Sequence, residues 1–151
     1  MRTPWILACA AIAAFASAIP APASAQVSIA AGGVLTSAPS GSGGGVMLSS
    51  STAVPSLPLQ VQGTVFAPLT TGGGYAATGE IRGLSGGGFG GAYIGGGLGF
   101  GRLPGAGTTG GVFTAFVGKP IAPSTTVEVR FYDGTSVGSK GLLFVGLRFS
   151  L

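Results

Sequence analysis

The sequence contains no histidine and a single cysteine, Cys9, which lies near the amino terminus. We expect Cys9 to be removed with an export signal, which would leave the mature chain without a thiol. This composition excludes a disulfide framework, a zinc site built from Cys and His, and catalysis by a Cys nucleophile or a His base. No metal and no cofactor are expected.

Charge is also scarce. Charged residues make up 7% of the chain and hydrophobic residues 46%, whereas an average soluble domain carries about 25% charged residues. The seven Lys and Arg residues outnumber the three Asp and Glu residues, but they are scattered and form no basic patch, so no nucleic-acid partner is expected. A surface so poor in charge indicates that lipid covers the mature chain.

Long apolar runs and helix-forming residues are missing after residue 25. No stretch there approaches the roughly 18 consecutive apolar residues of a membrane-spanning helix. Glu and Lys are rare, while glycine, a poor helix former, occurs 31 times. The expected class is all-β, and a chain of this kind would cross a membrane as strands.

The amino-terminal segment has the three parts of a secretory signal peptide. Arg2 gives it a positive start, an apolar segment follows over residues 5–19, and Ala23-Ser24-Ala25 matches the small-x-small pattern of signal peptidase sites. We therefore predict a cleaved signal peptide over residues 1–25 and one barrel domain over residues 26–151.

Two other interpretations of this segment are less favoured. A short membrane anchor is disfavoured because the apolar segment is too short to span a bilayer comfortably. A lipoprotein signal ending at Cys9 is disfavoured because it leaves too little apolar sequence before the cysteine. Cleavage before Gln26 remains the prediction.

After Gln26 the chain consists of short runs with an apolar residue at every second position, separated by Gly, Pro, Ser and Thr clusters. This is the two-residue period of β-strands. Most runs approach the roughly 9–11 residues that a tilted strand needs to cross a bilayer. The sequence predicts an eight-stranded antiparallel up-and-down transmembrane β-barrel, with strands near Val27–Thr36, Gly45–Thr52, Leu57–Ala67, Gly74–Gly83, Phe89–Gly101, Gly111–Lys119, Thr125–Asp133 and Leu142–Leu151.

The expected connections alternate in length. Those after the even-numbered runs are short and marked by Pro or Gly: Ala53–Ser56, Leu84–Gly88 and Pro120–Ser124. Those after the odd-numbered runs tend to be longer and polar or glycine-rich: Ser37–Gly44, Pro68–Gly73, Arg102–Gly110 and Gly134–Gly141. Short turns on the side of the termini and longer loops on the other side are typical of outer-membrane barrels.

The alternation also assigns faces. In the seventh run Val127, Val129 and Phe131 alternate with Glu128, Arg130 and Tyr132. In lipid the apolar set points outward and the charged set points inward. The predicted interior charge network consists of Glu80, Arg82, Glu128, Arg130 and Arg148.

The last two runs predict a specific register. A hairpin centred near Gly138 would place Glu128 opposite Arg148, Val129 opposite Leu147, and Phe131 opposite Val145. Every charge would then face inward and every apolar residue would face lipid. A slip by one residue would put Arg148 in hydrocarbon, at a cost of about 2–4 kcal/mol near the midplane.

The carboxy-terminal part resembles the small outer-membrane β-barrel proteins of the OmpA-like and surface-antigen type. The resemblance rests on the glycine-rich run over residues 91–100, the Gly118-Lys119-Pro120-Ile121 segment, the alternation over residues 127–132 and the final run over residues 143–151. It implies an outer-membrane location and recognition of the last strand by the barrel-assembly machinery. The implied assembly signal is Val145, Leu147, Phe149 and Leu151, although the family usually ends on an aromatic residue.

The expected function is a structural or interaction barrel of the bacterial outer membrane without catalysis. Its alternatives are a narrow porin-like channel and a soluble, secreted glycine-rich surface protein. An enzyme is disfavoured because the acid–base candidates are Glu80, Glu128 and Asp133, and the two glutamates are expected to pair with arginines. The GxGxxG spacing at residues 86–91 is attributed to glycine abundance. An outward glycine stripe offers an alternative docking surface for another envelope protein.

Overall fold

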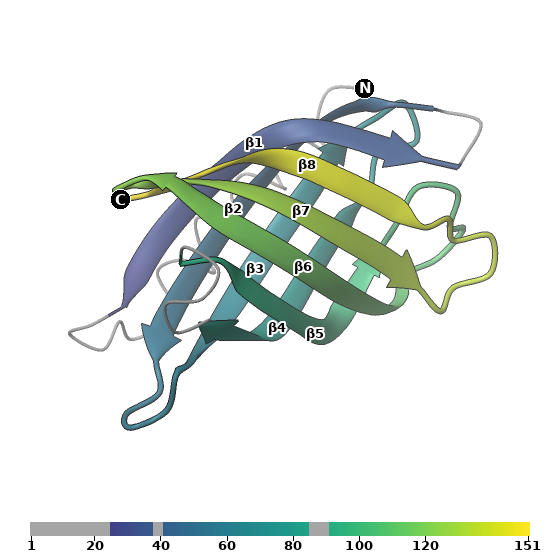
Figure 1. The fold of residues 1–151 in the computed structure, drawn as a ribbon. Coiled ribbons are helices and arrows are strands. Elements are labelled where there is room, and N and C mark those ends of the chain that lie inside the picture. Colours follow the sequence, from purple (N-terminus) through teal and green to yellow (C-terminus); the bar gives the residue numbers. More distant parts are fainter. Residues whose placement is uncertain (1–24, 38–40, 85–90) are drawn as a thin grey trace.

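A computed structural model of the chain describes residues 25–37, 41–84 and 91–151. Within these ranges there is no helix long and apolar enough to cross a membrane. The structure contains the strands β1 (Gln26–Thr36), β2 (Gly43–Ala53), β3 (Leu59–Leu69), β4 (Tyr75–Leu84), β5 (Tyr93–Arg102), β6 (Gly110–Ala122), β7 (Thr125–Gly134) and β8 (Leu142–Ser150). Each strand pairs antiparallel with its neighbour in sequence, and β8 pairs with β1 to close the barrel (Figure 1). The predicted eight-stranded barrel is confirmed, whereas the predicted signal peptide lies outside the described residues.

The strand bounds differ from the predicted runs by two or more residues at one end or both in β2, β3, β5 and β6. β2 extends beyond the predicted Gly45–Thr52 at both ends, and β5 begins at Tyr93 rather than at Phe89; Phe89 itself lies outside the described residues. The start of β2 consists of glycines, which show no apolar alternation. Their backbone nevertheless pairs with β3 as any extended backbone does, with Gly44 opposite Leu69.

The first and last strands bring the two ends of the barrel sequence together. Ser28 of β1 pairs with Ser150 of β8, and the Leu151 N–H donates to the Val27 carbonyl at 2.9 Å. We call this end of the barrel the terminus end and the opposite end the loop end. An even number of antiparallel strands thus brings both ends of the barrel to one side.

The predicted alternation of short and long connections is wrong in part. The terminus-end connections span residues 54–58, 85–92 and 123–124, and the loop-end connections span residues 37–42, 70–74, 103–109 and 135–141. The connection 54–58 at the terminus end is as long as the loop 70–74 at the other end. The predicted short turn Leu84–Gly88 lies, apart from Leu84, outside the described residues. The predicted turn Pro120–Ser124 is shorter than expected. β6 continues to Ala122, with an irregular register after Pro120, which has no N–H to donate.

The outward face of the barrel is apolar. Leu98 is 74% exposed, Ile94 71% and Ile81 57%, and other strands expose Val, Leu, Ile and Phe side chains at alternate positions in the same way. Among the described strand residues, the charged side chains that share the outward face lie near the two ends of the barrel: Lys119 toward the terminus end, and Arg102 and Asp133 toward the loop end.

The interior is divided into two halves along the barrel axis. The half toward the loop end, here the apolar half, contains Ala30, Val34, Met47, Phe66, Ala76, Leu103, Val112, Tyr132, Leu142 and Phe144. The half toward the terminus end, here the polar half, contains buried Ser49, Gln62, Thr64, Thr78, Glu80, Arg82, Thr114, Glu128, Arg130 and Arg148. On β2 and β3 the boundary falls at one level, since Met47 lies opposite Phe66 and Ser49 lies opposite Thr64.

The apolar half corrects the expectation that every apolar residue faces lipid. Leu142, Phe144 and Phe66 have no solvent exposure and point inward. An eight-stranded barrel is just wide enough to be filled by side chains. Packed apolar groups can fill that volume without hydrogen-bond partners, so the interior need not be polar along its whole length.

Two loops close the apolar half at the loop end. Leu103 and Ala106 of the loop 103–109 are buried, and the Ala106 N–H donates to the Leu103 carbonyl at 3.0 Å. Gly105 and Gly138 both have positive φ, and a Cβ added to Gly105 would lie 2.7 Å from the Gly138 carbonyl oxygen. Only glycine fits this close contact between the loops 103–109 and 135–141.

Candidate functional site

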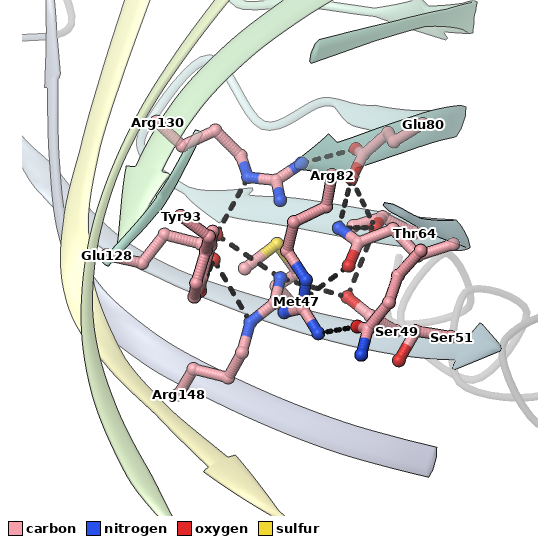
Figure 2. Close-up of polar contacts among 12 residues, drawn as sticks. Met47, Ser49, Ser51, Thr64, Glu80, Arg82, Tyr93, Glu128, Arg130 and Arg148 are labelled. Atoms are coloured by element: carbon pink, nitrogen blue, oxygen red, sulfur yellow. Dashed lines mark hydrogen bonds and ion pairs between the residues drawn. The ribbon is translucent and has the colours of Figure 1, made fainter. Parts of the chain in front are cut away.

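The polar half holds the chemically distinctive side chains of the described chain (Figure 2). β4, β7 and β8 supply its charged groups from inward-facing positions that lie two residues apart. The structure brings together all five residues of the predicted charge network, each at most 8% exposed: Glu80, Arg82, Glu128, Arg130 and Arg148.

The Glu80 carboxylate lies at the centre of one group of donors. The hydroxyls of Thr64 and Thr78 donate to it at 3.0 and 2.5 Å, and Gln62 Nε2 donates to its Oε2. Arg130 Nη1 forms an ion pair with its other oxygen, Oε1. Neutral and charged donors thus surround a carboxylate that is 2% exposed.

The Glu128 carboxylate is the centre of a second group and is linked to the first through Arg130. Arg130 Nε lies 2.9 Å from Glu128 Oε1, and the Tyr93 hydroxyl donates to Oε2 at 2.6 Å. Arg148 Nε lies 3.2 Å from Oε2, and Arg148 Nη2 donates to Oε1 at 3.2 Å. Arg130 therefore bridges the two carboxylates from one inward position.

Arg148 extends the network across the barrel to β2 and β3. Its Nη1 donates to Gln62 Oε1 at 3.2 Å and its Nη2 to Ser49 Oγ at 3.4 Å. Ser49 in turn shares a hydrogen bond of 3.1 Å with Thr64. The polar half is thus one connected network that joins β2, β3, β4, β5, β7 and β8.

The predicted register of β7 and β8 is wrong by two residues. Glu128 pairs with Gly146 rather than with Arg148, Val129 with Val145 rather than Leu147, and Phe131 with Leu143 rather than Val145. Glu128 and Arg148 are still in contact. A shift by two residues keeps each side chain on the same face of the sheet, and the long Arg148 side chain reaches diagonally across to Glu128 on the neighbouring strand.

The turn explains the shift. Tyr132 pairs with Leu142, so the hairpin is centred on Val137 instead of Gly138. The Ser139 N–H donates to the Ser136 carbonyl at 3.0 Å, which makes Val137 and Gly138 the two central residues of a tight turn. Gly138 takes the third position of this turn with φ of 80°, and a glycine is favoured at a third position with positive φ.

Aromatic rings complete the surroundings of the arginines. The Arg130 guanidinium carbon lies 4.0 Å from the centroid of the Phe116 ring, and that of Arg82 lies 4.5 Å from the Tyr93 centroid. Arg82 also donates through Nη2 to Gln60 Oε1. Stacking of this kind suits the planar, weakly hydrated guanidinium group.

Inward glycines of β5 make room for these side chains. A Cβ added to Gly97 would lie 2.2 Å from the Gly79 carbonyl oxygen and 2.6 Å from Glu80 Cγ. A Cβ added to Gly95 would lie 2.4 Å from the tip of the Phe116 ring. The glycine-rich strand thus leaves the space that Glu80 and Phe116 occupy.

The sequence reasoning missed Tyr93 as a member of the network. Its hydroxyl donates to Glu128 and its ring covers Arg82. Glycines occupy both faces of the run around Tyr93, so this run shows no alternation from which the inward direction of Tyr93 could be predicted. Ser49 was missed for a related reason, since β2 carries serines on both faces.

The arrangement leaves no free acid–base group in the described part of the network. Glu80 and Glu128 each accept hydrogen bonds from at least three side chains and are shielded from solvent. A general base must be within hydrogen-bond reach of a substrate proton. Across residues 25–37, 41–84 and 91–151, no three His, Cys, Asp or Glu side chains are grouped so that they could hold a metal ion.

The predicted assembly signal lies on the outward face of β8. Val145, Leu147 and Phe149 are 43%, 40% and 40% exposed, and Leu151 follows the strand at 79%. These four side chains therefore form one apolar stripe beside β1 and β7.

A closed barrel of eight up-and-down strands, apolar outside and charged within, has the architecture of small outer-membrane β-barrel proteins. The chain matches no family model and no curated protein sequence. Among solved structures it is similar to the crystal structure of Neisserial surface protein A (NspA), with a TM-score of 0.57 and 17% sequence identity, over 84% of this chain and 97% of that one. This likeness establishes the fold.

Proposed function

We propose that the chain is a structural or interaction barrel of the bacterial outer membrane, without catalytic activity. The observation that carries this proposal is the inverted distribution of side chains. The charged groups Glu80, Glu128 and Arg130 are at most 2% exposed inside, while Ile94 and Leu98 are more than 70% exposed outside. Such a surface is stable against hydrocarbon and unstable against water.

The positions of the outward charges support a membrane-spanning placement. Lys119 near the terminus end and Arg102 near the loop end flank an apolar surface that includes Leu98, Val117 and Phe131. Charge is tolerated at the two interfaces and is costly between them. By analogy with outer-membrane barrels, the terminus end faces the periplasm.

The closed interior disfavours the narrow porin-like channel. Phe66 stacks on Tyr132 with ring centroids 4.7 Å apart and meets Phe144 edge to face at 5.6 Å. These rings, together with the buried Leu103, fill the apolar half. The soluble secreted alternative is disfavoured in turn by the exposed apolar side chains of the outward face.

The test is to express the full chain in a Gram-negative host and follow the mature product. We expect it to stay with outer membranes after a carbonate wash, to migrate differently on gels before and after boiling, and to give no stable current in planar bilayers. Release by carbonate would contradict the membrane placement, and stable single-channel currents would favour the pore.

The last strand adds a second experiment on biogenesis. We propose that the barrel-assembly machinery reads the stripe formed by Val145, Leu147, Phe149 and Leu151. Phe149→Ala should then reduce the amount of folded barrel in the outer membrane, and Leu151→Phe should maintain or raise it. Phe113→Ala, which removes an outward aromatic ring from β6, is the matched control for a general loss of lipid contact.

A further inference from the structure

The interior of the barrel carries more positive than negative charge. Three arginines (Arg82, Arg130 and Arg148) and two glutamates (Glu80 and Glu128) are buried there. The third acidic side chain of the sequence, Asp133, lies on the outward side toward the loop end and accepts a hydrogen bond from the Gly134 N–H at 2.8 Å. One buried cation therefore has no carboxylate to balance it, and an unbalanced buried charge is destabilising.

The unbalanced cation is Arg82. Arg130 and Arg148 both form ion pairs with glutamate, whereas Arg82 forms none with any residue that the structure describes. Its contacts are the neutral Gln60 amide oxygen and the Tyr93 ring, and its Nε is buried without a hydrogen-bond partner. A neutral amide and a ring satisfy part of the guanidinium, which has no ion-pair partner among the described residues.

Arg82 lies at the mouth of the polar half, next to other donors. It is close to the terminus end of β4, where it pairs with Gln60 at the start of β3, and both the Arg148 guanidinium and the Glu128 carboxylate are near enough to act on its charge. Figure 2 shows both arginines reaching into the same part of the network. The inward positions toward this end carry hydroxyls, from Ser28, Ser51, Thr126 and Ser150.

We propose that Arg82 and Arg148, together with these hydroxyls, form a binding site for a small oxyanion of the phosphate class at the terminus-end mouth of the barrel. The anion would balance the excess charge and supply the acceptor that Arg82 Nε lacks. Guanidinium groups bind phosphate oxygens through charge-assisted hydrogen bonds, and hydroxyls add neutral donors. The two carboxylates lie deeper and are occupied by Arg130, Arg148 and their neutral donors, so they do not compete at the mouth.

Two sources can supply this chemistry, free inorganic phosphate and a phospholipid headgroup. The first measurement titrates inorganic phosphate into the full mature barrel in a non-ionic detergent, with ionic strength held constant by a bulky organic sulfonate, and follows the urea unfolding midpoint and the heat of binding. The second, in phosphate-free buffer, compares unfolding in vesicles of a neutral glycolipid with and without added phosphatidylglycerol. A saturable response in the first measurement identifies free phosphate, and a response confined to the vesicles identifies the headgroup.

Variants separate a site from a general salt effect. Arg82→Gln should weaken phosphate binding about tenfold or more, because it removes the charge-assisted hydrogen bonds. Arg82→Lys, which keeps the charge, should retain part of the binding and guards against misfolding of the Gln variant. Arg102→Gln removes the same charge from the outward face near the loop end and should bind phosphate as the unmodified barrel does.

Two results would overturn the proposal. The proposal fails if neither phosphate nor phosphatidylglycerol gives a saturable response in the unmodified barrel. It fails as well if Arg82→Gln and Arg102→Gln alter the response equally, because that outcome would make it a general effect of charge.

Discussion

The two halves of the barrel interior fill the same kind of space by different means. In the apolar half, Phe66, Tyr132 and Phe144 pack as rings that require only volume and shape. In the polar half, Glu80 and Glu128 require a complete set of donors, supplied by several strands. Because each polar group depends on partners from other strands, the polar half should be the less tolerant of single substitutions.

The difference also concerns what each half can contribute. Side-chain packing closes the apolar half, which is further covered by the loop 103–109. The polar half contains the unpartnered Arg82 Nε and lies next to the terminus end. The apolar half therefore closes the barrel against solutes, and the polar half carries the groups of the proposed binding site.

The largest expected effect comes from Arg130, which bridges both glutamates. Arg130→Met keeps most of the side-chain volume and leaves two buried carboxylates without their shared cation. We expect a loss of about 5 kcal/mol in the free energy of unfolding, or no folded barrel at all. Urea unfolding in detergent, followed by circular dichroism because the only tryptophan precedes Gln26, measures it. Exposed Arg102→Met is the control and should change little.

The matching change in the apolar half is Phe66→Ala. It removes a ring with no solvent exposure that stacks on Tyr132, and it leaves a cavity. The expected loss is about 3–4 kcal/mol, somewhat smaller than for Arg130→Met, since neighbouring apolar side chains can relax into the space. If Phe66→Ala proved the more damaging of the two changes, the proposed difference in tolerance between the halves would be wrong.

A third prediction concerns the diagonal pair of Glu128 and Arg148. The single changes Glu128→Gln and Arg148→Gln each leave a buried charge with fewer partners, and the double change removes both charges together. The double variant should lose less stability than the sum of the singles, with a coupling energy of about 1–3 kcal/mol. Strict additivity in this double-mutant cycle would mean that the two side chains do not interact.

The sequence predicted the fold because alternation with a period of two appears in almost every strand. It also predicted which face of β7 is charged, since Glu128 and Arg130 alternate with Val129 and Phe131. The same period could not distinguish registers two residues apart, which is why Glu128 was expected opposite Arg148. That choice depended on the turn around Gly138, which alternation does not describe.

Other features of the interior could not be predicted from the alternation of apolar and polar residues alone. The rule that every apolar residue faces lipid misplaces Leu142 and Phe144, although the period of two puts them on the same face as Arg148; an apolar side chain suits either environment. Tyr93 was hidden among glycines, whose value here is the space they leave for Glu80 and Phe116. Which side chains share a level of the barrel depends on the strand pairings, and these were known only from the structure.

The smallest expected effects lie at the boundary between the halves, at two inward positions of β2. Met47 contacts the Tyr132 hydroxyl through its sulfur at 3.7 Å, and Ser49 contacts Thr64 and Arg148 through its hydroxyl. Met47→Leu conserves volume and should cost less than about 1.5 kcal/mol. Ser49→Ala removes one buried hydroxyl and should cost about 1–2 kcal/mol, because Arg148 and Thr64 each lose a partner.

These two variants locate the boundary when each is combined with Arg148→Gln. Once Arg148 has lost its guanidinium, one of the two contacts that Ser49→Ala removes is already gone, so the two changes should cost less together than their sum. Among the described residues the hydrogen bond of Met47 is to Tyr132 in the apolar half, so Met47→Leu should add to Arg148→Gln within about 0.5 kcal/mol. Urea unfolding of the three single variants, the two double variants and the unmodified barrel gives both coupling energies. Equal coupling at the two positions would mean that the apolar and polar halves act as one unit rather than meeting at this boundary.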